Sequence, residues 1–166
     1  MFYIFLPAYN EEDNIKVVLD NLYKLYKRKF KGKKVFIVIV NDGSSDNTGK
    51  VIDKYVRFLK NKKNFFKIKK ITHKSNKGLG QTIKSGFKYV LKWSKKEDIL
   101  ISLDCDNTHP ANLISLMVKK IKYGNDLVIA SRFVKNSKVV GVPISRQILS
   151  YAASIIFRLF FPIKNV

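Results

Sequence analysis

Short apolar runs alternate with helical patterns along the whole chain. Five runs are rich in β-branched and aromatic residues and end in turn residues, which is typical of strands buried on both faces of a sheet. They are FYIFLP (2–7), KVFIVIV (34–40), FFKIKKIT (65–72), DILISLD (98–104) and DLVIASR (126–132). Apolar residues recur with helical spacing in the segments 15–22, 51–59, 79–91 and 113–121. This alternation predicts right-handed βαβ units and an open, mainly parallel α/β sheet flanked by helices.

The composition narrows the class of protein. The 166 residues are 46% hydrophobic, enough to bury one core. The formal net charge of +21 predicts attraction to polyanions, which could be nucleic acid, anionic lipid headgroups or a phosphorylated small substrate. The single cysteine, Cys105, permits no internal disulfide and suits a reducing compartment. Because no signal pattern opens the chain and no apolar run reaches the roughly 18 residues of a membrane span, we expect a cytoplasmic protein.

Acidic residues are concentrated in three places. Seven of the 12 Asp and Glu residues lie in short stretches, namely Glu11, Glu12 and Asp13, then Asp42 and Asp46, then Asp104 and Asp106. Each stretch follows a predicted strand, and the carboxyl ends of parallel strands form the edge where open α/β sheets bind ligands. Acids also favour helix starts for purely structural reasons. Three such clusters together nevertheless indicate carboxylate chemistry, and neither GxGxxG nor a P-loop stands at any of these turns.

The stretch LDCDNTHP (103–110) carries the most specific chemistry. Asp104 and Asp106 are two apart, so on an extended chain each can present an oxygen to one hard divalent cation. A metal there would bridge a diphosphate and neutralise its charge. We expect Cys105, between them, to point into the core. His109 is either a further ligand or part of a helix cap.

The two earlier loops are rich in hydrogen-bond acceptors. In PAYNEEDN (7–14), Asn10 can cap the first helix, and in VNDGSSDNTG (40–49), Asp46 or Asn47 can cap the second. The same oxygens, placed just outside a strand, are suited to the N–H and O–H donors of a base and a ribose. The residues alone leave both interpretations open.

Five ordered motifs carry a family resemblance over nearly the whole chain. They are LPAYNEEDNI (6–15), VNDGSSDNT (40–48), NKGLGQTIKSGF (76–87), LDCDNTHP (103–110) and ASRFV (130–134). Together they resemble the GT-A fold inverting glycosyltransferases of family 2, and more narrowly the dolichyl-phosphate mannose synthase branch with its polyprenyl-phosphate sugar synthase relatives. The resemblance implies an open, mainly parallel, twisted sheet. It also implies transfer of a hexose, with inversion, from a GDP-mannose or UDP-glucose type donor to a polyprenyl or dolichyl phosphate, with Mg²⁺ or Mn²⁺ as cofactor.

The resemblance implies roles for individual residues as well. For donor binding these are Pro7, Ala8, Tyr9, Glu11, Asp42, Lys77, Gly78 and Asp104; for the metal, Asp104 and Asp106; for catalysis, Asp104, Asp106 and Arg132; and for the acceptor phosphate, Arg132, Arg146 and Ser150. Thr108 stands where many relatives carry a Gln that joins the metal shell. Arg146 can alternatively be an interfacial residue that snorkels from an apolar helix.

We expect two regions, a catalytic and nucleotide-sugar-binding domain over 1–135 and an acceptor loop with a C-terminal helix over 136–166. The helical pattern of Ile144 to Ile163 is strongly apolar and is stopped by Pro162. Such a helix either packs against the sheet or lies in the surface of a membrane. The second interpretation predicts a peripheral protein on the cytoplasmic face of a membrane.

Relatives continue beyond the equivalent of Val166, so the resemblance implies that this chain lacks the family's C-terminal segment. Two alternatives to a polyprenyl-phosphate acceptor remain. A family 2 enzyme that glycosylates a hydroxyl generally needs a base carboxylate, and no Asp or Glu follows Asp126. A nucleic-acid-binding protein is suggested by the charge, but the sequence shows no recognised nucleic-acid module and we expect no nucleic-acid partner.

Overall fold

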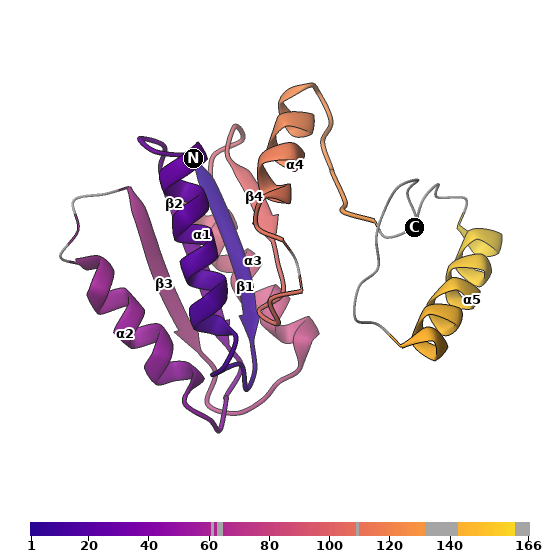
Figure 1. Ribbon diagram of the computed structural model, residues 1–166, viewed down its shortest axis with the longest axis horizontal. Coiled ribbons are helices and arrows are strands. Elements are labelled where there is room, and N and C mark those ends of the chain that lie inside the picture. Colours follow the sequence, from indigo (N-terminus) through magenta and orange to yellow (C-terminus); the bar gives the residue numbers. More distant parts are fainter. Residues whose placement is uncertain (61, 63–64, 109, 132–142, 162–166) are drawn as a thin grey trace. The chain divides into compact units, whose positions relative to one another are not determined.

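The computed structural model describes residues 1–60, 62, 65–108, 110–131 and 143–161 (Figure 1). The chain divides into two units, Met1–Lys119 and Lys120–Val166. The first unit contains the sheet and the three acidic clusters. The predicted boundary between residues 135 and 136 falls outside the described residues and stays a prediction.

The sheet of the first unit has four parallel strands in the order β3-β2-β1-β4. They are β1 (Phe2–Ala8), β2 (Val35–Asn41), β3 (Phe66–Thr72) and β4 (Ile99–Ser102). All four run the same way, so their carboxyl ends meet at one edge (Figure 1). The predicted parallel α/β architecture and the first four predicted strands are confirmed.

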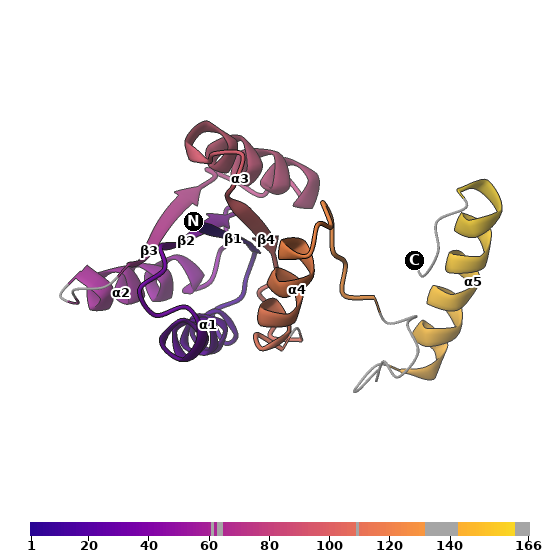
Figure 2. The same ribbon diagram turned by 90° about the horizontal axis from the view of Figure 1, so that it is seen from above.

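Helices cover both faces of this sheet. They are α1 (Ile15–Lys29), α2 (Thr48–Lys60), α3 (Leu79–Trp93) and α4 (Leu113–Lys122). Seen from above, α3 covers one face while α1 and α2 lie on the opposite face (Figure 2). The helices α2, α3 and α4 begin and end within three residues of the segments that the apolar spacing predicts, whereas α1 continues beyond its predicted segment (15–22) to Lys29.

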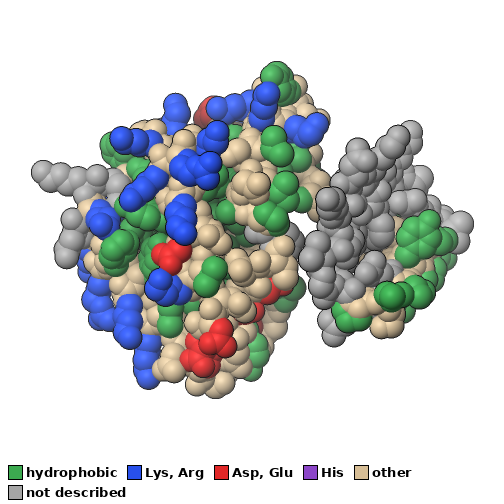
Figure 3. Space-filling view, in the orientation of Figure 1, with side chains coloured by type: hydrophobic (Ala, Val, Ile, Leu, Met, Phe, Trp, Pro, Cys, Tyr) green, Lys and Arg blue, Asp and Glu red, His purple; other side chains and the backbone are tan. Residues whose placement is uncertain are grey.

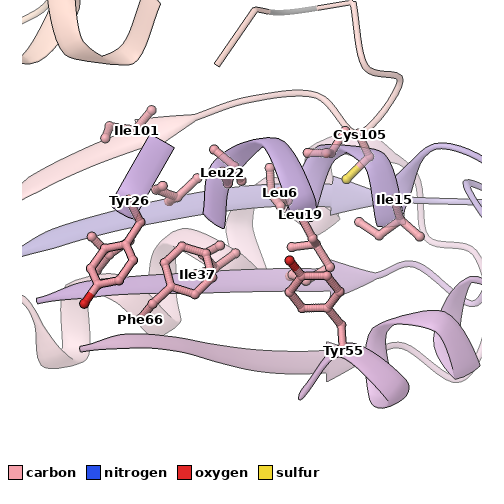
Figure 4. Close-up of a cluster of buried hydrophobic side chains, with 14 of the residues drawn as sticks. Leu6, Ile15, Leu19, Leu22, Tyr26, Ile37, Tyr55, Phe66, Ile101 and Cys105 are labelled. Carbon is pink, nitrogen blue, oxygen red and sulfur yellow. The ribbon is translucent and has the colours of Figure 1, made fainter. Parts of the chain in front are cut away.

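The core lies mainly between the sheet and α1 and α2. Alternate residues of β1, among them Ile4 and Leu6, join a buried cluster on that face. The side chains drawn in Figure 4 include Leu6, Ile15, Leu19, Leu22, Tyr26, Ile37, Tyr55, Phe66, Ile101 and Cys105. Full burial of each Leu or Ile contributes about 1.5–3 kcal/mol. The other face of β1 presents Tyr3, which packs with Val38 and Val90 beneath α3.

Two sequence predictions need correction. The strands β3 and β4 are not buried on both faces, since only Phe66 and Ile101 in them are fully buried. Both strands end the described sheet, where a lysine-rich sequence such as FKIKKIT hinders pairing with other chains. The fifth predicted strand is wrong for residues 126–131, which form no strand in the described chain. An apolar run becomes a strand only where another strand pairs with its backbone groups.

Close contact between α3 and β1 depends on a glycine. A Cβ at Gly86 would lie 2.2 Å from the ring of Phe5, which is fully buried. We therefore expect Gly86→Ala to lower the free energy of unfolding by roughly 1–3 kcal/mol through overpacking. The matched control is Gly80→Ala in the same helix, where the new Cβ would meet nothing within 4 Å. Urea unfolding of both variants checks this, and equal stability of the two would contradict the packing argument.

The second unit contains α5 (Ile144–Phe160), close to the predicted C-terminal helix. Within its own unit, α5 leaves several large apolar side chains exposed, namely Ile148, Leu149, Tyr151, Ile155, Ile156 and Phe160. Among the described helices, none combines the length and the hydrophobicity needed to cross a bilayer.

Candidate active site at the carboxyl edge of the sheet

A cleft of about 320 Å³ opens in the first unit where the strands end. The end of β1, the loops that follow all four strands and the start of α3 line it. The lining residues are Pro7, Ala8, Tyr9, Glu11, Asp42, Asn76, Gly78, Leu79, Thr82, Asp104, Cys105 and Asp106. Acidic side chains gather toward this edge, whereas Lys and Arg spread over the rest of the visible face (Figure 3). The cleft is thus an acidic site in a strongly basic protein.

Hydrogen bonds join the loops that follow β1 and β2. The backbone N–H of Ser45 donates to Oδ1 of Asn10 over 2.9 Å, and the N–H of Asn10 donates to Oγ of Ser44 over 3.0 Å. Asn10, at a φ of 53°, therefore bridges the loops, and the prediction that it caps the first helix is wrong. The cap position of α1 belongs to Asn14.

Two of the clustered acids, Glu12 and Asp46, also form hydrogen bonds between the loops that follow β1 and β2. Oδ2 of Asp46 accepts the N–H of Glu12 over 3.1 Å, and Oε2 of Glu12 accepts the N–H of Asn47 over 2.8 Å. Oδ1 of Asp46 also accepts the N–H of Thr48, the first residue of α2, over 2.9 Å. Burial acts to raise the pKa of Asp46, but the hydrogen bonds from the hydroxyl and N–H of Thr48 and from the N–H of Glu12 outweigh it and hold the pKa below its ordinary value. Glu12 and Asp46 thus shape the loops around the cleft.

Asp42 is the buried acid of the cleft, with 3% of its surface exposed. Its Oδ1 accepts hydrogen bonds from Nδ1 of His73 over 2.6 Å and from the backbone N–H of Lys77 over 3.0 Å. Burial acts to raise the pKa of the Asp42 carboxyl, but the bonds from His73 and Lys77 hold it below its ordinary value. Asp42 is therefore ionised at neutral pH and can act only as an acceptor.

Gly43 lets the loop after β3 approach Asp42. A Cβ at this position would lie 2.3 Å from the carbonyl carbon of Ser75, and the φ of Gly43 is +66°. Only glycine fits both the conformation and the space. The contact brings the backbone of Lys77 to Asp42 from a loop more than thirty residues away.

Asp104 and Asp106 line the same cleft after β4 and are both exposed. Cys105 between them is 2% exposed and belongs to the core, as predicted. Burial, together with the nearby acids, raises the pKa of its thiol, so the sulfur stays protonated. Oδ1 of Asp106 accepts the backbone N–H and the hydroxyl of Thr108, over 3.0 and 2.7 Å. Thr108 thereby fixes the orientation of the Asp106 carboxylate.

This pair of carboxylates fits a hard divalent cation. Carboxylate oxygens suit Mg²⁺ and Mn²⁺, and Mg²⁺ is usually held by one or two carboxylates with substrate phosphates and water. In the described part of the chain, no three His, Cys, Asp or Glu side chains form a metal cluster. The pair would therefore hold a cation together with a phosphorylated substrate. His109 lies outside the described residues.

Of the remaining predicted site residues, some line the cleft and others lie outside it or outside the described residues. Pro7, Ala8, Tyr9, Glu11 and Gly78 line the cleft with the acids. Lys77 is exposed and contacts Asp42 through its backbone. Of the predicted acceptor residues, Arg132 and the side chain of Arg146 lie outside what the structure describes, and Ser150 lies on α5 in the second unit.

Sequence reasoning missed four residues of the site. Asn76, Leu79 and Thr82 line the cleft, and His73 holds Asp42. The first three belong to the motif NKGLGQT, which the family resemblance includes without assigning them roles. His73 directly follows β3, so its place at the carboxyl edge of the sheet was a usable signal.

Comparison with known families decides what kind of cleft this is. The family described as "Glycosyl transferase family 2" matches residues 3–165. The chain belongs to glycosyl transferase family 2. The predicted family is thereby confirmed.

Curated relatives of this family member match nearly all of the chain. A dolichol-phosphate mannosyltransferase from Pyrococcus furiosus is 30% identical over 96% of the chain and 41% of its own length. A polyprenol monophosphomannose synthase from Mycolicibacterium smegmatis is 27% identical over 91% of the chain and 52% of its own length. A UDP-N-acetylglucosamine–dolichyl-phosphate N-acetylglucosaminyltransferase from Methanococcus voltae is 29% identical over 94% of the chain and 61% of its own length. The chain thus spans about half the length of these relatives.

Solved structures show the same fold. The mannosyltransferase PcManGT from Pyrobaculum calidifontis, in complex with GDP-Man and Mn²⁺, superposes with a TM-score of 0.60 at 20% identity, over 81% of this chain and 35% of that one. The structure of S. aureus TarS 1-349 superposes with a TM-score of 0.54 at 21% identity, over 81% of this chain and 40% of that one. The chain therefore has the GT-A fold, as its motifs predict.

Proposed function

We propose that this chain binds a nucleotide sugar and a divalent cation in the cleft, and that the protein transfers a hexose to a polyprenyl phosphate with inversion. The observation that carries the proposal is the convergence of the buried acceptor Asp42 and the exposed pair Asp104 and Asp106 in one cleft. The names of the three curated relatives support the lipid phosphate as acceptor.

The nucleoside would occupy the part of the cleft around Asp42. An ionised carboxylate accepts an N–H from the base, and its burial strengthens that bond. Tyr9 and Leu79 offer partly exposed apolar surface in the same cleft, against which a base can pack. Pro7, Ala8, Glu11 and Gly78 complete the donor-binding wall, and Lys77 lies next to it.

The diphosphate would lie against Asp104 and Asp106. When bound there, a divalent cation neutralises the diphosphate and makes it a better leaving group. Thr108 holds Asp106 through one carboxylate oxygen, which leaves the other oxygen for the cation. Oxygen donors of this kind suit both Mg²⁺ and Mn²⁺.

The acceptor would be a lipid phosphate held by Arg132, Arg146 and Ser150. A phosphate oxygen is already ionised near neutral pH, so it can attack the anomeric carbon without a dedicated general base. Arginines hold phosphate by charge-assisted, often bidentate hydrogen bonds. Attack from the side opposite the nucleoside diphosphate inverts the configuration of the sugar.

A thermal-shift screen tests donor binding. The screen compares GDP-mannose, UDP-glucose and UDP-N-acetylglucosamine, each with and without Mn²⁺. A ligand present at 100 times its Kd stabilises the folded state by about 2.7 kcal/mol. We expect one donor to raise the unfolding temperature, and more so with Mn²⁺. If no donor changes it under either condition, the proposal is wrong.

We further propose that the protein lies peripherally on the cytoplasmic face of a membrane, through α5. Its exposed apolar side chains suit the boundary between headgroups and acyl chains. The net charge of +21 adds attraction to anionic lipids, on the order of 1 kcal/mol per basic residue near the surface.

This placement predicts binding to anionic liposomes that salt weakens but does not abolish, since the apolar contribution is not screened. Replacing Phe160 and Phe161 with serine should reduce the salt-resistant part of the binding in a flotation assay. The control replaces Leu91 and Trp93, which are exposed on α3, with serine. Equal loss in both double variants, or no liposome binding at low salt, would contradict a membrane role for α5.

A further inference from the structure

Asp42 in the wall of the cleft and two further side chains, those of His73 and Ser85, form a continuous hydrogen-bonded relay. Oγ of Ser85 lies 2.9 Å from Nε2 of His73, and Nδ1 of His73 lies 2.6 Å from Oδ1 of Asp42. Asp42 follows β2, His73 follows β3 and Ser85 lies on α3, so the relay joins three elements. The side chains of His73 and Asp42 are only 9% and 4% exposed.

The chemistry of the relay fixes which histidine nitrogen carries the proton. The Asp42 carboxylate is ionised and has no proton to give, so Nδ1 of His73 must be the donor in that bond. In a neutral imidazole, Nε2 then accepts a hydrogen bond from the hydroxyl of Ser85. Asp42 thus fixes the tautomer, and the hydroxyl of Ser85 supplies the donor that the other ring nitrogen needs.

The order of groups matches a Ser–His–Asp nucleophile, but their placement is reversed. In such a site the serine faces the substrate and the aspartate lies behind. Among the described residues of this relay, it is Asp42 that lines the cleft. Ser85 immediately precedes Gly86, whose Cα packs against the Phe5 ring of β1. The relay is therefore built to orient the carboxylate.

We propose that His73, held by Ser85, is a positioning residue for donor recognition by Asp42. The inference rests on the proposed function and deepens it. His73 and the backbone N–H of Lys77 both bond to Oδ1, which commits that oxygen to the protein. Recognition of a base N–H then falls to Oδ2, whose direction the relay fixes. The loss of the His73 bond leaves the carboxylate ionised but less firmly oriented, since the N–H of Lys77 still bonds to Oδ1.

One test needs no ligand. The chain has two histidines, His73 and His109, so a His109→Gln variant assigns their ¹⁵N signals. We expect the imidazole of His73 to carry its proton at Nδ1, and to keep it there in Ser85→Ala, because the Asp42 carboxylate can only accept. A His73 protonated at Nε2 alone would overturn the proposal, whatever the protein binds.

A second test separates the two nitrogens. The side-chain N–H of asparagine can replace the Nδ1 donor to Asp42, whereas glutamine reaches Ser85 and loses that donor. Because a hydrogen bond to a charged group is worth about 1.5–3 kcal/mol, we expect His73→Gln to weaken donor binding by roughly ten- to a hundredfold. His73→Asn should retain most of the affinity. Isothermal titration at saturating Mn²⁺ gives both values.

These measurements distinguish a positioning role of His73 from a purely structural one. If both variants lose affinity equally and in step with their thermal stability, the role of His73 is structural and the proposal is wrong. Parent-like binding by His73→Gln also overturns it. If the parent chain binds no nucleotide sugar, the proposed function fails, and positioning for a donor fails with it. The ¹⁵N signals then still decide whether His73 donates to Asp42.

Discussion

Asp106→Asn should weaken Mn²⁺-dependent donor binding by at least roughly a hundredfold. Loss of a group that merely supports a metal ligand typically costs about 10–100-fold in metal affinity, and loss of a direct ligand should cost more. Asparagine keeps an oxygen that can accept from Thr108, so the local turn survives. Since the Asp106 side chain is exposed, the unfolding temperature should stay unchanged. Isothermal titration with and without Mn²⁺ measures the effect.

The matched control is Asp13→Asn, which removes an exposed carboxylate from the loop before α1. It should bind the donor as the parent does. A general effect of net charge would change both variants alike. Parent-like Mn²⁺ dependence in Asp106→Asn would remove Asp106 from the metal site.

Asp42→Ala should weaken donor binding by roughly 10–150-fold whether or not metal is present. Its proposed partner is the base, and a hydrogen bond to a charged group contributes about 1.5–3 kcal/mol. The substitution also leaves the N–H groups of His73 and Lys77 without their acceptor, so some stability is lost as well. Calorimetry with a nucleoside monophosphate in the absence of metal isolates the base contribution.

Asp53→Ala provides the comparison for this variant. Asp53 lies on α2, is about half exposed and pairs with Lys70 over 2.6 Å, so its loss removes an ion pair away from the base. Donor binding should persist in it. If Asp42→Ala loses affinity only when Mn²⁺ is present, Asp42 serves the diphosphate and its assignment to the base is wrong.

Much of the fold follows from local pattern because the central strands are buried on both sides. β1 and β2 are almost wholly buried, and their sequences are continuous apolar runs that periodicity detects. Where burial is one-sided, as in β3, the pattern still predicts a strand but not its edge position. The run at 126–131 shows the limit, since pairing depends on the partner and not on the run itself.

The site was predictable where topology alone brings residues together. Asp42 and Asp104 follow parallel strands, so their convergence at one edge needs no detailed geometry. The roles of Glu12 and Asp46 were not predictable, because a carboxylate that bonds a neighbouring loop looks the same in sequence as one that binds a ligand. His73 meets Asp42 because its backbone N–H bonds to the carbonyl of Asn41 over 2.9 Å and so continues the pairing of β2 with β3, which the sequence alone did not give.

The central claim is that a nucleotide sugar and a divalent cation occupy the same cleft. Paramagnetic broadening by Mn²⁺ in ¹⁵N-labelled protein tests this most directly, because it reports the position of the ion itself. With the donor present, the amide signals of Ala8, Gly78 and Asp106 should broaden together, while that of Glu97, before β4 at the opposite edge of the sheet, should persist. Broadening centred elsewhere, or signals of Ala8 and Gly78 that ignore the donor, would contradict the account.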